Sequence, residues 1–133
     1  MDVHTLARHS LAAIRLVNGT AALLAPQLVA HRLGAYRTQP ALAYVLRMFG
    51  VRTVVLGAEL LVLEGEELRR ALRVGTFIHA TDALSAACAG REGTLPPRTA
   101  RATTAVSTIN AALTLLAQCH DGCPKAVRRR RPS

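Results

Sequence analysis

The chain is poor in several residue types, and each shortage narrows what it can be. Its 133 residues include no Trp, two Tyr and two Phe, so aromatic side chains supply little of its apolar bulk. Ala, Leu and Val make up most of the apolar half of the sequence, and this composition favours helices packed through small side chains. No hairpin dipeptide is flanked by alternating β-branched residues, so we expect no strands and predict an all-α fold.

Cysteine is also scarce, which argues against a disulfide framework. The three cysteines are Cys88, Cys119 and Cys123. The segment from Cys119 to Cys123 offers at most three metal ligands, and no second cluster accompanies it, so we predict no metal site and no cofactor. The segment also fits a helix end stopped by Gly122 and Pro124, and whether its two cysteines pair stays open.

Lysine is almost absent, because 16 of the 17 basic residues are Arg. This bias is typical of a GC-rich genome and suggests an actinobacterial source. Much of the net charge of +9 lies in the last nine positions, which hold Lys125 and Arg128 to Arg131. No aromatic residues interleave with these arginines, so we expect no nucleic-acid binding. We predict one domain over residues 1–124 and a disordered basic tail over 125–133 that is attracted to anionic lipid.

Four long apolar segments predict helices over residues 5–24, 40–63, 67–89 and 97–118, with a short amphipathic piece over 27–33. Each long helix would measure about 30–36 Å at 1.5 Å per residue, which matches the hydrocarbon core of a bilayer. Because the segments have similar lengths and short connections, we predict a four-helix up-down bundle.

Long uninterrupted apolar runs are missing, so a soluble bundle remains an alternative. The longest stretch without Asp, Glu, Lys or Arg runs from Ala102 to His120 and contains several Thr, Ser, Asn and Gln. However, the charges elsewhere are too sparse to cover an outer face, since only Arg52 and Glu59 are charged between Val51 and Leu63. We therefore predict an integral membrane protein.

The charged and amide residues inside the helices form narrow polar lines that we expect to face the bundle interior. Arg8 and Arg15 share a helix face, as do Arg52 and Glu59. Gly50 and Gly57 share a different face and allow a neighbouring helix to approach closely. The interior polar residues are Arg15, Asn18, Arg47, Arg52, Glu59, His79, Asp82 and Asn110, followed in the last helix by Thr104, Ser107 or Thr108, Thr114 and Gln118.

The loop charges predict a topology. One side would carry nine basic residues: Arg8, Arg69, Arg70, Arg73, Lys125 and Arg128 to Arg131. The other side would carry five: Arg32, Arg37, Arg91, Arg98 and Arg101. The positive-inside rule then places the protein in the cell membrane with both termini in the cytoplasm.

Three short segments resemble a family of small, uncharacterised actinobacterial membrane proteins that are distantly similar to the DoxX type. They are Leu46 to Gly57 with its Arg-x-x-Gly-x-Arg core, Arg15 to Gly19 followed by Leu24-Ala25-Pro26, and Asp82-Ala83-Leu84. The resemblance covers roughly residues 10 to 90 and implies a four-helix integral membrane protein without an agreed activity. Glu59 and the Cys119/Cys123 pair lie outside the shared pattern.

The favoured interpretation is a membrane protein in which paired buried charges fix helix register. Arg52 would reach Asp82, while Arg15 and Asn18 would reach Glu59 or Asp82. The main alternative is a membrane-embedded, cofactor-free isomerase or cyclase acting on a lipophilic small molecule. Its candidate catalytic residues are Asp82, Arg52, Glu59 and His79, and its candidate binding residues are Arg15, Asn18 and Arg47. A homo-oligomeric transporter and a soluble helical-bundle binding protein are further alternatives, and whether the chain is an enzyme stays open.

Overall fold

The computed structural model describes residues 2–34 and 40–118, and within these ranges it contains helices and no strands. The all-α prediction is therefore confirmed. The five helices are α1 (Val3–Leu24), α2 (Pro26–Arg32), α3 (Pro40–Val62), α4 (Gly65–Arg91) and α5 (Pro97–Gln118). The predicted basic tail and the Cys119/Cys123 segment lie outside the described residues.

Proline and glycine set most of the helix boundaries. α1 ends just before Pro26, which occupies the first turn of α2, and the two helices meet at an angle of 107°. Gly34 follows α2 with a φ of 90°, a left-handed conformation that glycine adopts without steric cost. α4 begins at Gly65, two residues before the predicted start, and Gly65 also has a positive φ of 55°.

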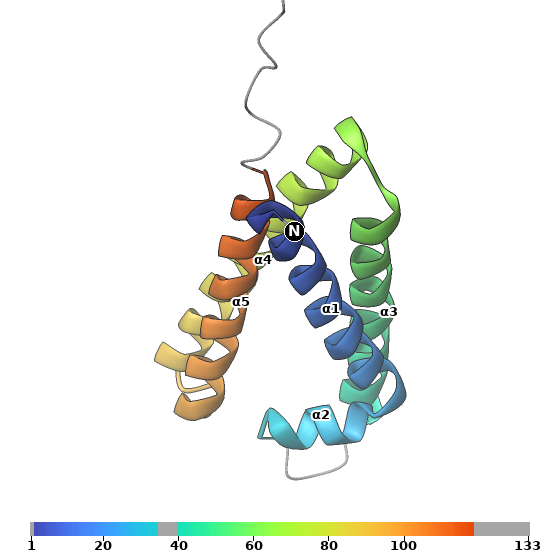
Figure 1. The fold of residues 1–133 in the computed structure, drawn as a ribbon. Helices are drawn as coiled ribbons and strands as arrows, with labels where there is room; N and C mark the ends of the chain where they lie inside the picture. Colours follow the sequence, from blue (N-terminus) through green and yellow to red (C-terminus); the bar gives the residue numbers. More distant parts are fainter. Residues whose placement is uncertain (1, 35–39, 119–133) are drawn as a thin grey trace, which may run out of the picture.

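The long helices form two pairs that diverge like the arms of a V (Figure 1). α1 packs along α3 and α4 packs along α5, while α1 also contacts α5. The chain alternates in direction, so the N-terminal end of α1, the α3–α4 turn and the end of α5 lie at the closed end of the V. α2 lies across the open end. The expected up-down alternation is present, but the expected closed bundle is not, because the arms separate beyond the closed end.

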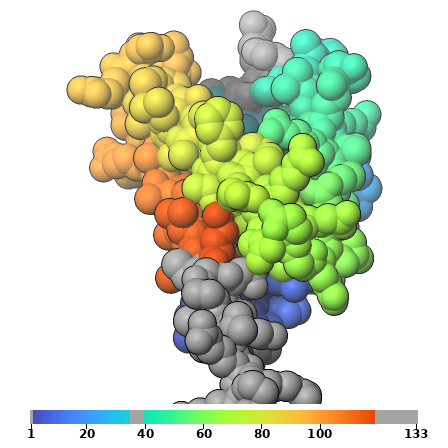
Figure 2. Space-filling model, turned by 90° about the horizontal axis from the view of Figure 1, so that it is seen from above, coloured from blue at the N-terminus to red at the C-terminus, as the bar shows by residue number. Residues whose placement is uncertain are grey.

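The apolar core occupies the closed end. Leu11, Leu60 and Leu72 are fully buried there. Seen from this end, the first turns of α4 lie between α3 and the end of α5 (Figure 2). Arg8 also joins the helices there, because its guanidinium donates to the carbonyl oxygens of Leu60 and Leu63, with 2.9 Å to the second. It thus binds the carbonyl groups that the end of α3 leaves without helical partners.

α1 and α3 pack backbone against backbone. A Cβ atom on Gly50 would lie 2.7 Å from the carbonyl oxygen of Gly19, and one on Gly57 would lie 3.1 Å from the Cβ of Arg15. The predicted close approach at Gly50 and Gly57 is therefore confirmed, with Gly19 as its counterpart on α1. Small residues at helix interfaces are typical of membrane helices.

Large apolar side chains are more numerous on the surface than in the interior. Within residues 2–34 and 40–118, the buried apolar residues are seven Ala and five Leu, whereas twenty large hydrophobic side chains are exposed across all five helices. None of the described helices is, taken singly, both long and apolar enough to cross a bilayer; α1 and α2 reach the required hydropathy only as a bent pair.

Candidate functional site

A cavity of about 710 Å³ lies between the two arms and is lined by all five helices. Such a volume is in the range of small-molecule sites, about 300–1,000 Å³. Of the seven candidate catalytic and binding residues, five line this cavity: Arg15, Asn18, Arg52, His79 and Asp82. The structure therefore brings together side chains from α1, α3 and α4 that the sequence only suggested as neighbours.

Arg15 forms the inner end of the cavity and connects three helices. Its side chain is 3% exposed. From α1, its Nη1 donates to the carbonyl oxygen of Leu56 on α3 at 3.1 Å, and its Nη2 lies 2.9 Å from Nε2 of His79 on α4. Gly75 makes room for this guanidinium, because a Cβ there would lie 2.6 Å from Nη2. Arg15 thus holds the two arms together where the apolar core ends.

The contact with Arg15 occupies Nε2 of His79 and fixes the protonation state of the ring. Both Nε and Nη2 of Arg15 approach its Nε2, which must act as the acceptor because a guanidinium has only donors. The ring is neutral in this arrangement and carries its proton on Nδ1. An acid–base reaction at Nε2 of His79 would have to break this contact, so the enzyme hypothesis depends mainly on Asp82.

A second polar layer lies nearer the open end. In the antiparallel α4–α5 pair, Gly75 lies beside Thr114 and Gly90 beside Ala100. This register places Asn110 level with His79, and Ser107 level with Asp82. Asn18 and Arg52 lie on the opposite wall, and both also line the cavity.

The ion pairs predicted in this layer are not formed. Within residues 2–34 and 40–118, the ion pairs are those of Glu66 with Arg69 and Arg73, and neither Arg52 nor Asp82 takes part in one. The predicted pairing of Arg15 or Asn18 with Glu59 or Asp82 is likewise replaced by the Arg15–His79 contact. Arg52 still acts on Asp82 through its charge, although the two groups are too far apart for an ion pair.

Two proposed residues lie outside the cavity lining. Arg47 is exposed on α3 and is not among the residues that line the cavity. Glu59 is half-buried and does not line the cavity either, although its charge acts on Arg15. Glu59 therefore serves as a nearby counter-charge to the arginine that ties the arms.

Asn110 contributes a feature that was not among the proposed binding residues. Its side chain is 6% exposed, lines the cavity, and its Oδ1 is a buried oxygen without a hydrogen-bond partner in the described part of the chain. Ser107, one turn earlier, is also buried and lines the cavity. The sequence identifies both as polar positions within an apolar helix. It does not specify the neighbouring side chains that decide whether each one has a hydrogen-bond partner.

The mouth of the cavity is predominantly apolar. Towards the open end, the apolar lining residues are Ala21, Ala22, Val29, Leu33, Val45, Leu46, Phe49 and Ala102, and the polar ones are Arg32 from α2 and Thr99 and Thr103 from α5. The cavity is therefore amphipathic, with a polar inner end and an apolar entrance. Within residues 2–34 and 40–118, no three His, Cys, Asp or Glu side chains are grouped so as to hold a metal ion.

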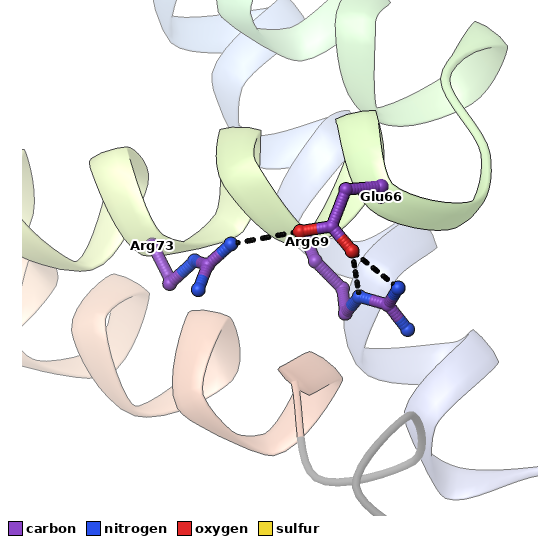
Figure 3. A network of polar contacts seen from close by, with 3 residues as sticks. All are labelled: Glu66, Arg69 and Arg73. Carbon is purple, nitrogen blue, oxygen red and sulfur yellow. Dashed lines mark hydrogen bonds and ion pairs between the residues drawn. The ribbon is translucent and has the colours of Figure 1, made fainter.

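The charges at the start of α4 form a separate surface network (Figure 3). Glu66 accepts from Nε of Arg69 at 3.2 Å and from Nη2 of Arg73 at 3.2 Å. Arg69 first, and Arg73 less strongly, lower the pKa of the Glu66 carboxyl group. This network is exposed on the first turns of α4 and lies at the closed end, away from the cavity.

No family model, curated protein or solved structure matches the chain. The similarity to DoxX-type proteins consequently stays a prediction that depends on the short segments quoted above.

Proposed function

We propose that this is a multi-pass membrane protein whose cavity receives a lipophilic small molecule from the bilayer. The observation that carries the proposal is the distribution of apolar side chains in the described part of the chain: five Leu and seven Ala are buried, whereas twenty large hydrophobic residues are exposed. Monomeric soluble proteins rarely expose apolar patches larger than a few hundred Å².

The exposed apolar residues surround the molecule, which favours lipid over a single protein partner. Only Val45, Phe49 and Val106 among them line the cavity. The others lie on all five helices, including Val17 on α1 and Phe77 on α4. A partner protein would cover one face, whereas a bilayer surrounds every helix.

The helix charges fit the same environment. Within membranes, acidic and basic side chains pair with one another or with backbone carbonyl groups. Arg8 and Arg15 both bind carbonyl oxygens of α3, and Arg52 faces the cavity. An Arg at the centre of a membrane helix costs about 2.5–3.5 kcal/mol on insertion scales, and these contacts offset part of that cost.

The proposed orientation places both termini and the closed end in the cytoplasm, following the excess of basic residues there. The cavity then opens towards the outer side, and α2 lies along that membrane surface because it is turned 107° from α1. A lipophilic molecule could reach the apolar mouth between the arms directly from the lipid.

Carbonate and urea washes of membranes containing the full chain test the membrane part of the proposal. We expect the protein to stay in the pellet, as an integral control protein does, while a peripheral control is released. Release into the supernatant would contradict the proposal and favour a soluble oligomer that covers its apolar surface by self-association.

The orientation is tested by cysteine labelling in a variant in which Cys88, Cys119 and Cys123 are replaced by Ala. A membrane-impermeant maleimide applied to intact cells should label E92C, in the α4–α5 loop, and should label E64C only after the cells are opened. The reverse pattern would overturn the orientation while leaving membrane insertion intact.

A further inference from the structure

We infer that the cavity binds an uncharged lipophilic alcohol, whose hydroxyl group donates a hydrogen bond to Oδ1 of Asn110. This inference deepens the proposed function and rests on it, since the ligand would enter from the lipid. Three properties of the cavity carry it: a buried acceptor without a donor, a balanced set of charges at the inner end, and a predominantly apolar path to the mouth.

The acceptor is the side-chain oxygen of Asn110. This residue is 6% exposed and lines the cavity from α5, and its Oδ1 accepts no hydrogen bond within the described residues. Buried side-chain oxygens normally have a donor, because an unsatisfied oxygen loses its hydration without compensation. Only a ligand group with an O–H or N–H bond can satisfy Oδ1, whereas carboxylates, ethers and ketones are acceptors only.

The surroundings of Oδ1 favour a hydroxyl among the possible donors. A hydroxyl is the smallest uncharged donor, so it requires the least displacement of the side chains that enclose this oxygen. It also has two acceptor lone pairs, which need donors of their own. Ser107 lies one turn before Asn110, is buried and lines the cavity, so its hydroxyl can donate to the ligand oxygen.

The charges at the inner end are balanced, which disfavours an ionic head group. The charge of Glu59 acts on Arg15, whose guanidinium is already bonded to α3 and to His79. The charge of Arg52 acts on Asp82. A carboxylate or an ammonium group would add an uncompensated charge to this desolvated site, which is costly, whereas an alcohol adds none.

The remainder of the cavity suits the lipophilic part of the molecule. Leu33, Leu46 and Phe49 lie on the path from the inner end to the mouth. The volume of about 710 Å³ is within the range of small-molecule sites. With the hydroxyl at Asn110, the apolar body of the alcohol lies against these side chains and its far end reaches the lipid.

Binding of tritiated hexadecanol to the full-length protein in nanodiscs tests the inference, with empty nanodiscs as the correction for partitioning into lipid. Unlabelled hexadecanol, hexadecyl methyl ether and palmitate are the competitors. The ether keeps the oxygen acceptor and lacks the donor. We expect the alcohol to displace the label at roughly tenfold lower concentration than the ether, the effect of one buried hydrogen bond, and palmitate to be weaker than the alcohol.

Asn110→Leu removes the acceptor and keeps a side chain of similar size. In this variant the alcohol and the ether should become equal competitors. N110L should stay folded, because Oδ1 has no partner to lose within the described residues, and circular dichroism checks this. Thr108→Val is the matched control, because Thr108 is on the same helix, exposed and outside the cavity lining, so the tenfold difference should persist.

The comparison of alcohol with ether on the unmodified protein decides the inference even if N110L fails to fold. Equal displacement there, or an unchanged difference in folded N110L, would overturn it and leave a cavity for lipophiles without a donor. Stronger displacement by palmitate would overturn it in favour of an anion. Absence of saturable hexadecanol binding to a protein that resists carbonate extraction would overturn both the alcohol inference and the cavity part of the proposed function.

Discussion

The closed end of the V and the cavity are built from the same four long helices, yet they differ in how their side chains are partnered. At the closed end, Leu11, Leu60 and Leu72 are fully buried and Arg8 binds the end of α3. In the cavity, Arg52 and Asp82 have no ion-pair partner and the amide oxygen of Asn110 has no hydrogen bond, within the described residues.

The comparison shows that polar residues inside an apolar helix can serve two different purposes. Arg8 donates its hydrogen bonds to backbone carbonyl groups of the α3 end, and Arg15 contacts a carbonyl group of α3 and His79. These contacts hold the helices together. Asn110, level with His79, and Arg52, farther from the closed end than Arg15, keep unused hydrogen-bonding capacity. The first group fixes the geometry, and the second group is available to a ligand.

The largest effect is expected at the closed end. Leu72→Ala should lower the free energy of unfolding by about 2–5 kcal/mol, because it removes a fully buried side chain and leaves a cavity. Leu84→Ala, on the same helix and 66% exposed, should change it by less than about 0.5 kcal/mol. Unfolding in denaturing detergent, followed by circular dichroism, measures both. Equal losses would show that the closed end is not the core of the protein.

A smaller effect is expected at the boundary between the two regions. Arg15→Gln should cost about 1.5–3 kcal/mol, the range for hydrogen bonds of a charged group, because it removes the contacts to Leu56 and His79. The arms should also separate, which would broaden the distance between spin labels at T20C and the exposed Cys88 in a variant lacking Cys119 and Cys123. Arg47→Gln is the control, and an unchanged distance distribution in R15Q would show that Arg15 does not join the arms.

The smallest effect is expected within the cavity. A double-mutant cycle of Arg52→Gln and Asp82→Asn should give a coupling free energy below about 0.5 kcal/mol, because the two groups are not in contact. Unfolding in denaturing detergent provides the four values. A coupling above about 1 kcal/mol would support the original hypothesis of a register-fixing pair and would weaken the contrast between the two regions.

The sequence predicted the helices more accurately than their neighbours. Helical periodicity, Pro40 and the breaker residues gave the boundaries to within about two residues, since these are local properties. Seven-residue spacing also identified Gly50 and Gly57 as a contact face. In contrast, the expected contact of Arg52 with Asp82 assumed a closed bundle, and no local pattern specifies the angle at which two helix pairs diverge.

The sequence by itself determined an all-helical chain with alternating direction, a glycine face on α3 and polar residues within apolar helices. These follow from backbone propensities and the helical period, which act over a few residues. Only the tertiary structure decided which polar residues are partnered. Arg15 reaches His79 because Gly75 leaves space for its guanidinium, whereas Oδ1 of Asn110, at the same level, has no partner within the described residues. Such outcomes depend on the packing of residues that are distant in the chain.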